Sequence, residues 1–158
     1  MSQPRGYMRL VFPAVEVPAT AALRPPSPED AAALAALMMS AYVGTIDYEG
    51  ESEADALIEV RRTLSGDRGP FLWSASRVIE REGKLASASL VIRWKEQPLV
   101  AFAMTAAPFK RRGLARACLL GSIHHLQANA ERELGLFVTL ANHDASRLYE
   151  SLGFRLQQ

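Results

Sequence analysis

Apolar residues recur at helical spacing after Ser27-Pro28-Glu29-Asp30, a segment typical of a helix start. The serine can cap the helix, the proline suits its first position, and the two acids favour its positive end. We expect this helix to run to residue 42, because Gly44 then ends the pattern. Further helices are expected at about 52–64, from 113 to about 133, and from Asn142 or Asp144 to Gly153.

Segments rich in β-branched residues, with loose alternation of apolar and polar positions, indicate strands between these helices. The expected strands are Met8 to Val17, Phe71 to Glu80, Lys84 to Lys95, Leu99 to Thr105, Leu136 to Leu140 and Phe154 to Leu156. Arg81-Glu82-Gly83 joins the second and third of them as a hairpin-like turn. The resulting order, β-α-α-β-β-β-α-β-α-β, predicts an α/β protein with a mixed sheet and helices on both faces.

Length and composition narrow the class of protein further. The 158 residues fit one domain, 1–158, in which residues 1–20 form a strand-containing extension. The chain is 49% hydrophobic and 22% charged, which predicts a folded core, and its net charge of +1 argues against a nucleic-acid partner. The longest apolar stretch, Ala31 to Met39, is far shorter than the roughly 20 residues of a membrane span. Pro13 and Glu16 interrupt the N-terminal apolar stretch, which favours a strand over a signal peptide, so we expect a cytoplasmic protein.

Residues that could hold a metal are few and poorly placed. Cys118 is the single cysteine, so the chain has no internal disulfide and no cysteine-rich zinc site. Its apolar neighbours predict a core position. His124 and His125 are adjacent on a predicted helix and point about 100° apart, so they cannot share a metal ion. We expect no metal site.

The strongest chemical signal is the segment Phe109 to Ala115, which lies between a predicted strand and a long helix. The first N–H groups of a helix are free, and the helix dipole adds partial positive charge to them. Gly113 allows a close approach of the backbone. The cationic side chains here are Lys110, Arg111, Arg112 and Arg116. These features predict a pyrophosphate site, with a merely solvated basic helix start as the alternative, and neither a P-loop nor a G-x-G-x-x-G turn is present.

Residues 110–115 resemble the Q/R-x-x-G-x-G/A signature of the GNAT superfamily of acyl-CoA-dependent N-acetyltransferases. About 30 residues after Gly113, the segment 136–154 looks like the second signature of that family: a strand, then N-x-x-A-x-x-x-Y, then G-F. The matching residues are Asn142, Ala145, Tyr149, Gly153 and Phe154. The resemblance covers the chain from about Ala22 to Phe154. Two positions depart from the family pattern: Lys110 stands where Gln or Arg is usual, and Pro108 comes one residue late.

The resemblance implies a GNAT-like fold with a mixed, largely antiparallel sheet. It also implies transfer of an acetyl group from acetyl-CoA to a small amine or a peptide amine, by direct attack in a ternary complex. The residues expected to contact the cofactor are Met104, Thr105, Ala106, Lys110, Arg111, Arg112, Gly113, Leu114, Ala115, Asn142 and Tyr149. Asn142 would contact the pantetheine arm or cap the last helix.

Three residue groups match the steps of the family's chemistry. Backbone N–H groups at Met104 to Ala106 would polarise the thioester carbonyl. Tyr149 matches the tyrosine assigned as general acid; the alternative is an apolar helix residue tipped with a hydroxyl. The amine must also lose a proton, and Glu49 and Glu51 are the candidate bases, because the acceptor site of the family commonly lies between its first two helices. Each glutamate could equally belong to a solvated acidic loop, which together with Asp47 would attract a cationic amine.

Two questions stay open on the sequence. The same fold could serve as a non-catalytic acyl-CoA-binding or sensor module. The family also closes its sheet with a strand beyond the one that starts at Phe154, and this chain ends at Gln158. We expect Met8 to Val17 to cover the exposed edge, or a second subunit of a homodimer to do so.

Overall fold

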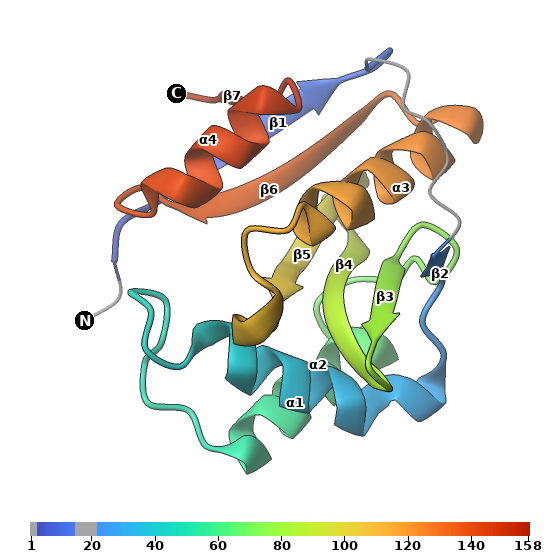
Figure 1. The fold of residues 1–158 in the computed structure, drawn as a ribbon. Coiled ribbons are helices and arrows are strands. Elements are labelled where there is room, and N and C mark those ends of the chain that lie inside the picture. Colours follow the sequence, from blue (N-terminus) through green and yellow to red (C-terminus); the bar gives the residue numbers. More distant parts are fainter. Residues whose placement is uncertain (1–2, 15–21) are drawn as a thin grey trace.

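The computed structural model describes residues 3–14 and 22–158 (Figure 1). Its strands are β1 (Arg5–Val11), β2 (Leu23–Arg24), β3 (Arg77–Arg81), β4 (Lys84–Trp94), β5 (Gln97–Thr105), β6 (Glu133–Thr139) and β7 (Arg155–Leu156). Its α-helices are α1 (Ala31–Tyr42), α2 (Glu53–Ser65), α3 (Leu114–Ala128) and α4 (His143–Ser151). Short 3₁₀ turns precede α1 and α3, at Pro28–Asp30 and Ala107–Phe109.

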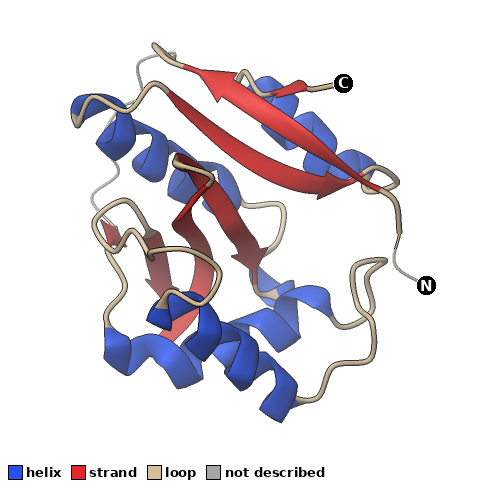
Figure 2. Cartoon of the chain, turned by 180° about the vertical axis from the view of Figure 1, so that it is seen from behind, coloured by secondary structure: helices blue, strands red, loops and turns tan. Residues whose placement is uncertain are grey.

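The described strands form one mixed sheet in the order β2-β3-β4-β5-β6-β1-β7. Neighbours run antiparallel except β5 and β6, which are parallel. Helices α3 and α4 lie on one face and α1 and α2 on the other, as Figures 1 and 2 show from opposite sides. The predicted fold class, a largely antiparallel mixed sheet with helices on both faces, is confirmed. Among the described residues, no helix combines the length and the apolar character needed to cross a membrane.

The helix boundaries follow from local hydrogen bonds between side chains and the backbone. At the start of α2 the Ser52 hydroxyl accepts from the Asp55 N–H (3.1 Å), and the Asp55 carboxylate accepts from the Ser52 N–H (2.9 Å). Gly66, at φ +91°, ends the helix in the left-handed conformation. Before α1, the Asp30 carboxylate accepts from the Ser27 N–H (2.8 Å). Cys118 is buried as expected, and burial raises the pKa of its thiol to about 12.

Some predicted boundaries are wrong where turns replace regular structure. The strand expected from Phe71 begins only at Arg77. Between them the Ser76 hydroxyl donates to the Leu72 carbonyl (3.0 Å) and accepts from the Val91 N–H (2.9 Å), so a side chain replaces part of the ladder. Helix α3 ends at Ala128 rather than near 133, and β6 starts at 133 rather than 136.

The N-terminal strand β1 lies inside the sheet rather than at its edge. It pairs with β6 along its whole length and also with β7, so both of its sides are occupied. The strand expected at Met8 to Val17 starts earlier and stops at Val11; residues 15–17 lie outside the described part. Gly135 makes the close pairing possible, because a Cβ atom there would overlap the Tyr7 ring. A segment from the start of the chain thus joins β6 to the last strand.

The position of β1 predicts how strongly its buried side chains stabilise the fold. Met8 is 2% exposed in the core under α4, whereas Val11 on the same strand is 58% exposed. We expect Met8→Ala to lower the free energy of unfolding by about 2–5 kcal/mol, because it removes packed atoms and leaves a cavity. Val11→Ala should change it by less than about 0.5 kcal/mol. Urea unfolding of the two variants measures both values, and similar losses would contradict a central β1.

Candidate functional site

The site begins where two parallel strands separate. β5 and β6 are paired only at Leu99 with Gly135 and at Val100 with Leu136. Beyond these pairs β5 continues along β4 as far as Thr105, while β6 turns away (Figure 1). From residue 101 to 105, β5 therefore has no strand paired on the side of β6. We call this unpaired region, between residues 101–105 and 137–139, the splay.

The backbone of β5 directs one of the three predicted N–H groups into the splay. The Ala106 N–H donates to the Ala86 carbonyl of β4 (2.8 Å), so it is engaged within the sheet. Successive residues of a strand point their backbone groups to opposite sides. The Met104 N–H therefore points toward β4 as well, and the Thr105 N–H points into the splay.

The turn before α3 presents a row of free backbone donors. Arg111 and Gly113 have positive φ, +65° and +78°, so the chain bends sharply into the helix. Within the described residues, no N–H group from Arg111 to Arg116 donates to a protein acceptor. A Cβ atom at Gly113 would meet nothing within 4 Å, so the backbone is open to the outside there. Such a turn, at the positive end of a helix, has the geometry of an anion-binding site.

The basic side chains of the turn divide into two groups. The Lys110 ammonium donates to the Ala41 carbonyl in the last turn of α1 (2.7 Å), so it holds the turn against α1. The Arg112 guanidinium lies over the Phe109 ring at 5.5 Å and is exposed. Arg111 is also exposed. The arginines, rather than Lys110, are thus placed to meet an anion in front of the turn.

Contacts between α3 and α4 hold the second signature beside this turn. Arg116 on α3 donates to the Ser151 hydroxyl on α4 (2.7 Å). Arg111 lies 3.8 Å from the Asp144 carboxylate in the first turn of α4, with both side chains largely exposed. The two motifs that the sequence separates by about 30 residues therefore form one surface.

Asn142 caps α4 and also binds the loop between α1 and α2. Its side-chain oxygen accepts from the Ala145 N–H (3.1 Å), which confirms a capping role. Its side-chain nitrogen donates to one oxygen of Asp47 (3.2 Å), and the Thr139 hydroxyl donates to the other (2.6 Å). In Figure 1 the loop carrying Asp47 rises from α1 toward the end of β6.

Tyr149 lies seven residues after Asn142, on the same face of α4. Its ring packs edge-on against Phe154, with the centroids 6.0 Å apart. Burial raises the pKa of Tyr149 to about 12; the Asp47 carboxylate adds to the rise, and the Arg5 guanidinium opposes it. The phenol therefore holds its proton at neutral pH. Burial also raises the pKa of Tyr42 at the end of α1, with Tyr149 and Asp47 as further causes.

The two predicted bases lie elsewhere on the loop. Glu49 and Glu51 are exposed, and a carboxylate oxygen of Glu51 accepts from the Glu49 N–H (3.0 Å). The structure brings Asp47 instead to the end of β6, where its charge raises the pKa of Tyr149. In the sequence, Asp47 is only one charge of an acidic loop, and Tyr42 belongs to no motif. The one signal for Tyr42 is its place two residues before Gly44, which ends the helix.

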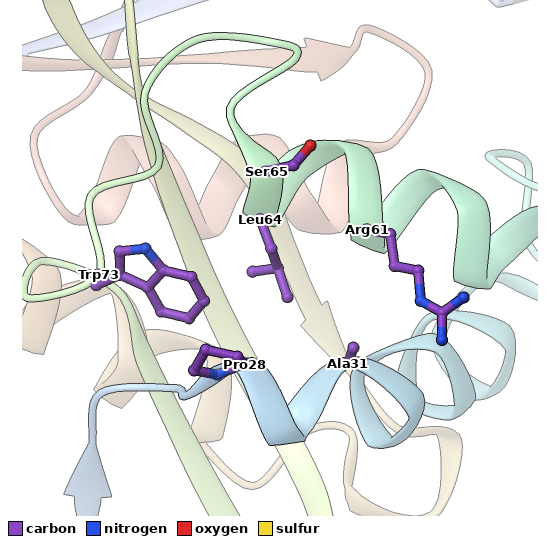
Figure 3. A pocket seen from close by; sticks show the side chains of 6 residues that line it. All are labelled: Pro28, Ala31, Arg61, Leu64, Ser65 and Trp73. Carbon is purple, nitrogen blue, oxygen red and sulfur yellow. The ribbon is translucent and has the colours of Figure 1, made fainter.

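A cavity of about 410 Å³ lies away from these residues (Figure 3). It opens between the start of α1 and the end of α2, and the Trp73 ring forms one wall. Its other lining residues are Pro28, Ala31, Arg61, Leu64 and Ser65. It contains none of the predicted site residues, so it is separate from the candidate site.

Comparison with known proteins supports the likeness seen in the two motifs. The family model described as FR47-like protein matches residues 81–158, which include both signatures. A search of curated proteins finds no significant match.

Solved structures share the fold at low sequence identity. An acetyltransferase described as putative and of the GNAT family, from Novosphingobium aromaticivorans, is 21% identical with a TM-score of 0.71; the match covers 99% of this chain and 61% of that one. The ribosomal-protein-S18-alanine N-acetyltransferase of Escherichia coli is 23% identical with a TM-score of 0.69, over 86% of this chain and 78% of that one. AAC(6')-Iy, solved with the bisubstrate analogue CoA-S-monomethyl-acetylneamine, is 13% identical with a TM-score of 0.63, over 84% and 89%. At this identity the structures establish the fold, and the chain spans only 61% of the first of them.

The environment of Tyr149 predicts a late titration. Its folded-state pKa of about 12 lies above the ordinary value of about 10, so the folded state binds the phenolic proton more tightly than the unfolded chain. The stability gained is complete below pH about 10 and is lost as the pH rises through about 12. The difference in phenolate absorbance between the wild type and Tyr149→Phe reports on this tyrosine. We expect that difference to rise with a midpoint near pH 12. A midpoint near pH 10 would show that the phenol is open to water.

Proposed function

Because the FR47-like match and the shared fold assign this chain to the GNAT superfamily, we propose that it transfers an acetyl group from acetyl-CoA to a primary amine. The observation that carries the proposal is the opening of the splay beside the turn at the start of α3. Acetyl-CoA needs one place for its anionic pyrophosphate and another for the reacting carbonyl of its thioester. The turn and the splay supply these two places side by side.

The donor would bind with its pyrophosphate at the turn. The free N–H groups of residues 111–116 would donate to phosphate oxygens, and Arg111 and Arg112 would add charge. Gly113 leaves room for the phosphate to approach the backbone. Leu114 is buried and Ala115 half-buried, so these two contribute their backbone more than their side chains. Lys110 would act indirectly, by fixing the turn to α1.

The reaction would take place in the splay. The Thr105 N–H would donate to the thioester oxygen as negative charge develops on it. The neutral amine would attack the carbonyl carbon, forming a C–N bond while the C–S bond breaks. Tyr149 would give its proton to the departing thiolate, and a carboxylate would take the proton that the amine loses. The resemblance offers Glu49 and Glu51 for that base, and the position of Asp47 at the end of β6 makes it a third candidate.

A second possibility is a module of the same fold that binds acyl-CoA without turnover. The protonated Tyr149 and the Asp47 carboxylate, whose charge raises the pKa of that tyrosine, favour the enzyme, because a binding module has no need of a proton donor and a proton acceptor in one site. The two possibilities share the donor site and differ only in release of free CoA. Each therefore calls for its own measurement.

Acetyl-CoA binding should depend on the arginines of the turn. We expect Arg111→Glu plus Arg112→Glu to weaken binding by about tenfold or more, because each arginine can form a charge-assisted hydrogen bond to phosphate. Arg62→Glu plus Arg132→Glu is the matched control, with the same charge change at exposed positions on α2 and beyond the far end of α3. Isothermal titration calorimetry gives the affinities. Equal weakening in both double variants would show that net charge alone explains the effect. Absence of acetyl-CoA binding by the wild type would refute the donor site.

Turnover should depend on the Tyr149 hydroxyl. We expect Tyr149→Phe to lower kcat by about 10²–10⁴-fold, the usual loss for a general acid, while the Kd for acetyl-CoA changes little. Free thiol release with a panel of amines measures kcat. A variant as fast as the wild type would leave Tyr149 as a packing residue against Phe154.

A further inference from the structure

The Asp47 carboxylate is held in place by neutral groups only. Thr139 and Asn142 each donate one hydrogen bond, one to each of its oxygens. Neither donor cancels the negative charge, and within the described residues no cation lies within 4.0 Å of Asp47. An ionised carboxylate can accept about four hydrogen bonds, so capacity for a cationic ligand remains. The side chain is half-buried at the end of β6 and can be reached from outside.

A positive charge faces the same place from β1. Arg5 is paired with Thr139 in the antiparallel register, and directly opposed residues project to the same face of a sheet. The Arg5 side chain therefore lies on the face where Thr139 meets Asp47. Its guanidinium is 5.8 Å from the centre of the Phe137 ring, and among the described residues it forms no ion pair.

The two charges lie around the same pair of phenols without neutralising each other. The Asp47 carboxylate raises the pKa of Tyr42 and Tyr149, and the Arg5 guanidinium lowers it. A lone carboxylate would suit any amine. A carboxylate and a guanidinium that both lie at the end of β6 suit a molecule that carries both an ammonium and a carboxylate.

We infer that the acceptor is a free amino acid, whose amino group is received by Asp47 and whose carboxylate is received by Arg5. This rests on the proposed function and names its acceptor class. Asp47 then has a second task, because a carboxylate in contact with the ammonium can take the proton that the nitrogen loses before it attacks.

An aromatic cluster next to Arg5 indicates which amino acids to try first. Tyr7, Trp94 and Phe137 are half-buried on the same face, with ring centroids 5.2–6.2 Å apart. Phe137 is the member that also contacts Arg5. Apolar and aromatic side chains would pack on such a surface, so phenylalanine and leucine are the first probes.

The test compares each amino acid with its amide, which keeps the amine and loses the carboxylate. For the wild type we expect kcat/KM with phenylalanine to exceed that with phenylalaninamide by about tenfold or more, as one charge-assisted contact implies. Arg5→Gln should reduce this ratio to near one. Arg9→Gln is the matched control on the same strand, where Arg9 faces Glu133 instead (3.9 Å), and it should keep the ratio.

Asp47→Asn keeps the size of the side chain and removes its charge. We expect it to lower kcat/KM by about 10²-fold or more for the acid and the amide alike, and to shift the pH profile, because both amines lose the same base. Circular dichroism and thermal unfolding would verify that each variant is folded. A loss confined to stability, with an unshifted pH profile, would make Asp47 a loop anchor and overturn its assigned task.

Binding separates failure of this inference from failure of the proposed function. Phenylalanine is titrated calorimetrically into the wild type and Arg5→Gln in the presence of CoA. Binding that needs Arg5, without thiol release, would uphold the amino-acid site and refute the acetyltransferase. Thiol release with simple amines or phenylalaninamide as fast as with phenylalanine would uphold the enzyme and refute the amino-acid acceptor. Absence of both binding and release would refute both.

Discussion

Two residue pairings join β5 to β6, and the rest of the candidate site depends on the parting of the strands beyond them. A parallel pair that continued would bury its N–H and C=O groups in the ladder and leave no opening. The separation turns part of β5 into a strand with one free side inside the sheet. A free side of this kind normally invites pairing with another chain. Here the 3₁₀ turn and α3 follow β5 directly, so the free side of β5 lies next to the turn that we propose binds the anionic part of the donor.

β1 lies between β6 and β7, so these two strands belong to one sheet only because β1 joins them. β6 would be an outer strand without it, and the two residues of β7 could not hold α4 in position. β1 fills the gap with Met8 and Leu10 buried on the α4 side and Tyr7 packed over Gly135 on the other. The same strand brings Arg5 to the end of β6. β1 therefore completes the sheet and also supplies the charge of Arg5 at the end of β6.

How much the sequence predicts depends on how local the determinants are. The proposed donor half of the site lies within residues 104–116 and 142–149, where helix starts, glycine and basic residues have direct local meaning. Those elements form as expected. Two of their polar groups have partners outside the segment that the local pattern does not predict. Lys110 looks like a phosphate ligand in sequence, but its ammonium finds a free carbonyl at the end of α1, 69 residues away in the chain. Ala106 fits the pattern for a free N–H, yet its donor completes the ladder with Ala86.

The proposed acceptor half is different because its parts come from three distant segments. Asp47 meets Thr139 across 92 residues, and Arg5 reaches Thr139 only because β1 pairs with β6. No periodicity or motif signals such a meeting, and three acids in one loop look equivalent until the fold selects one. Glu49 and Glu51 have only local partners among their hydrogen bonds, whereas Asp47 is fixed by two donors at the end of β6. A carboxylate held at two points keeps its place without a ligand, and this preorganisation is what recognition of an ammonium requires.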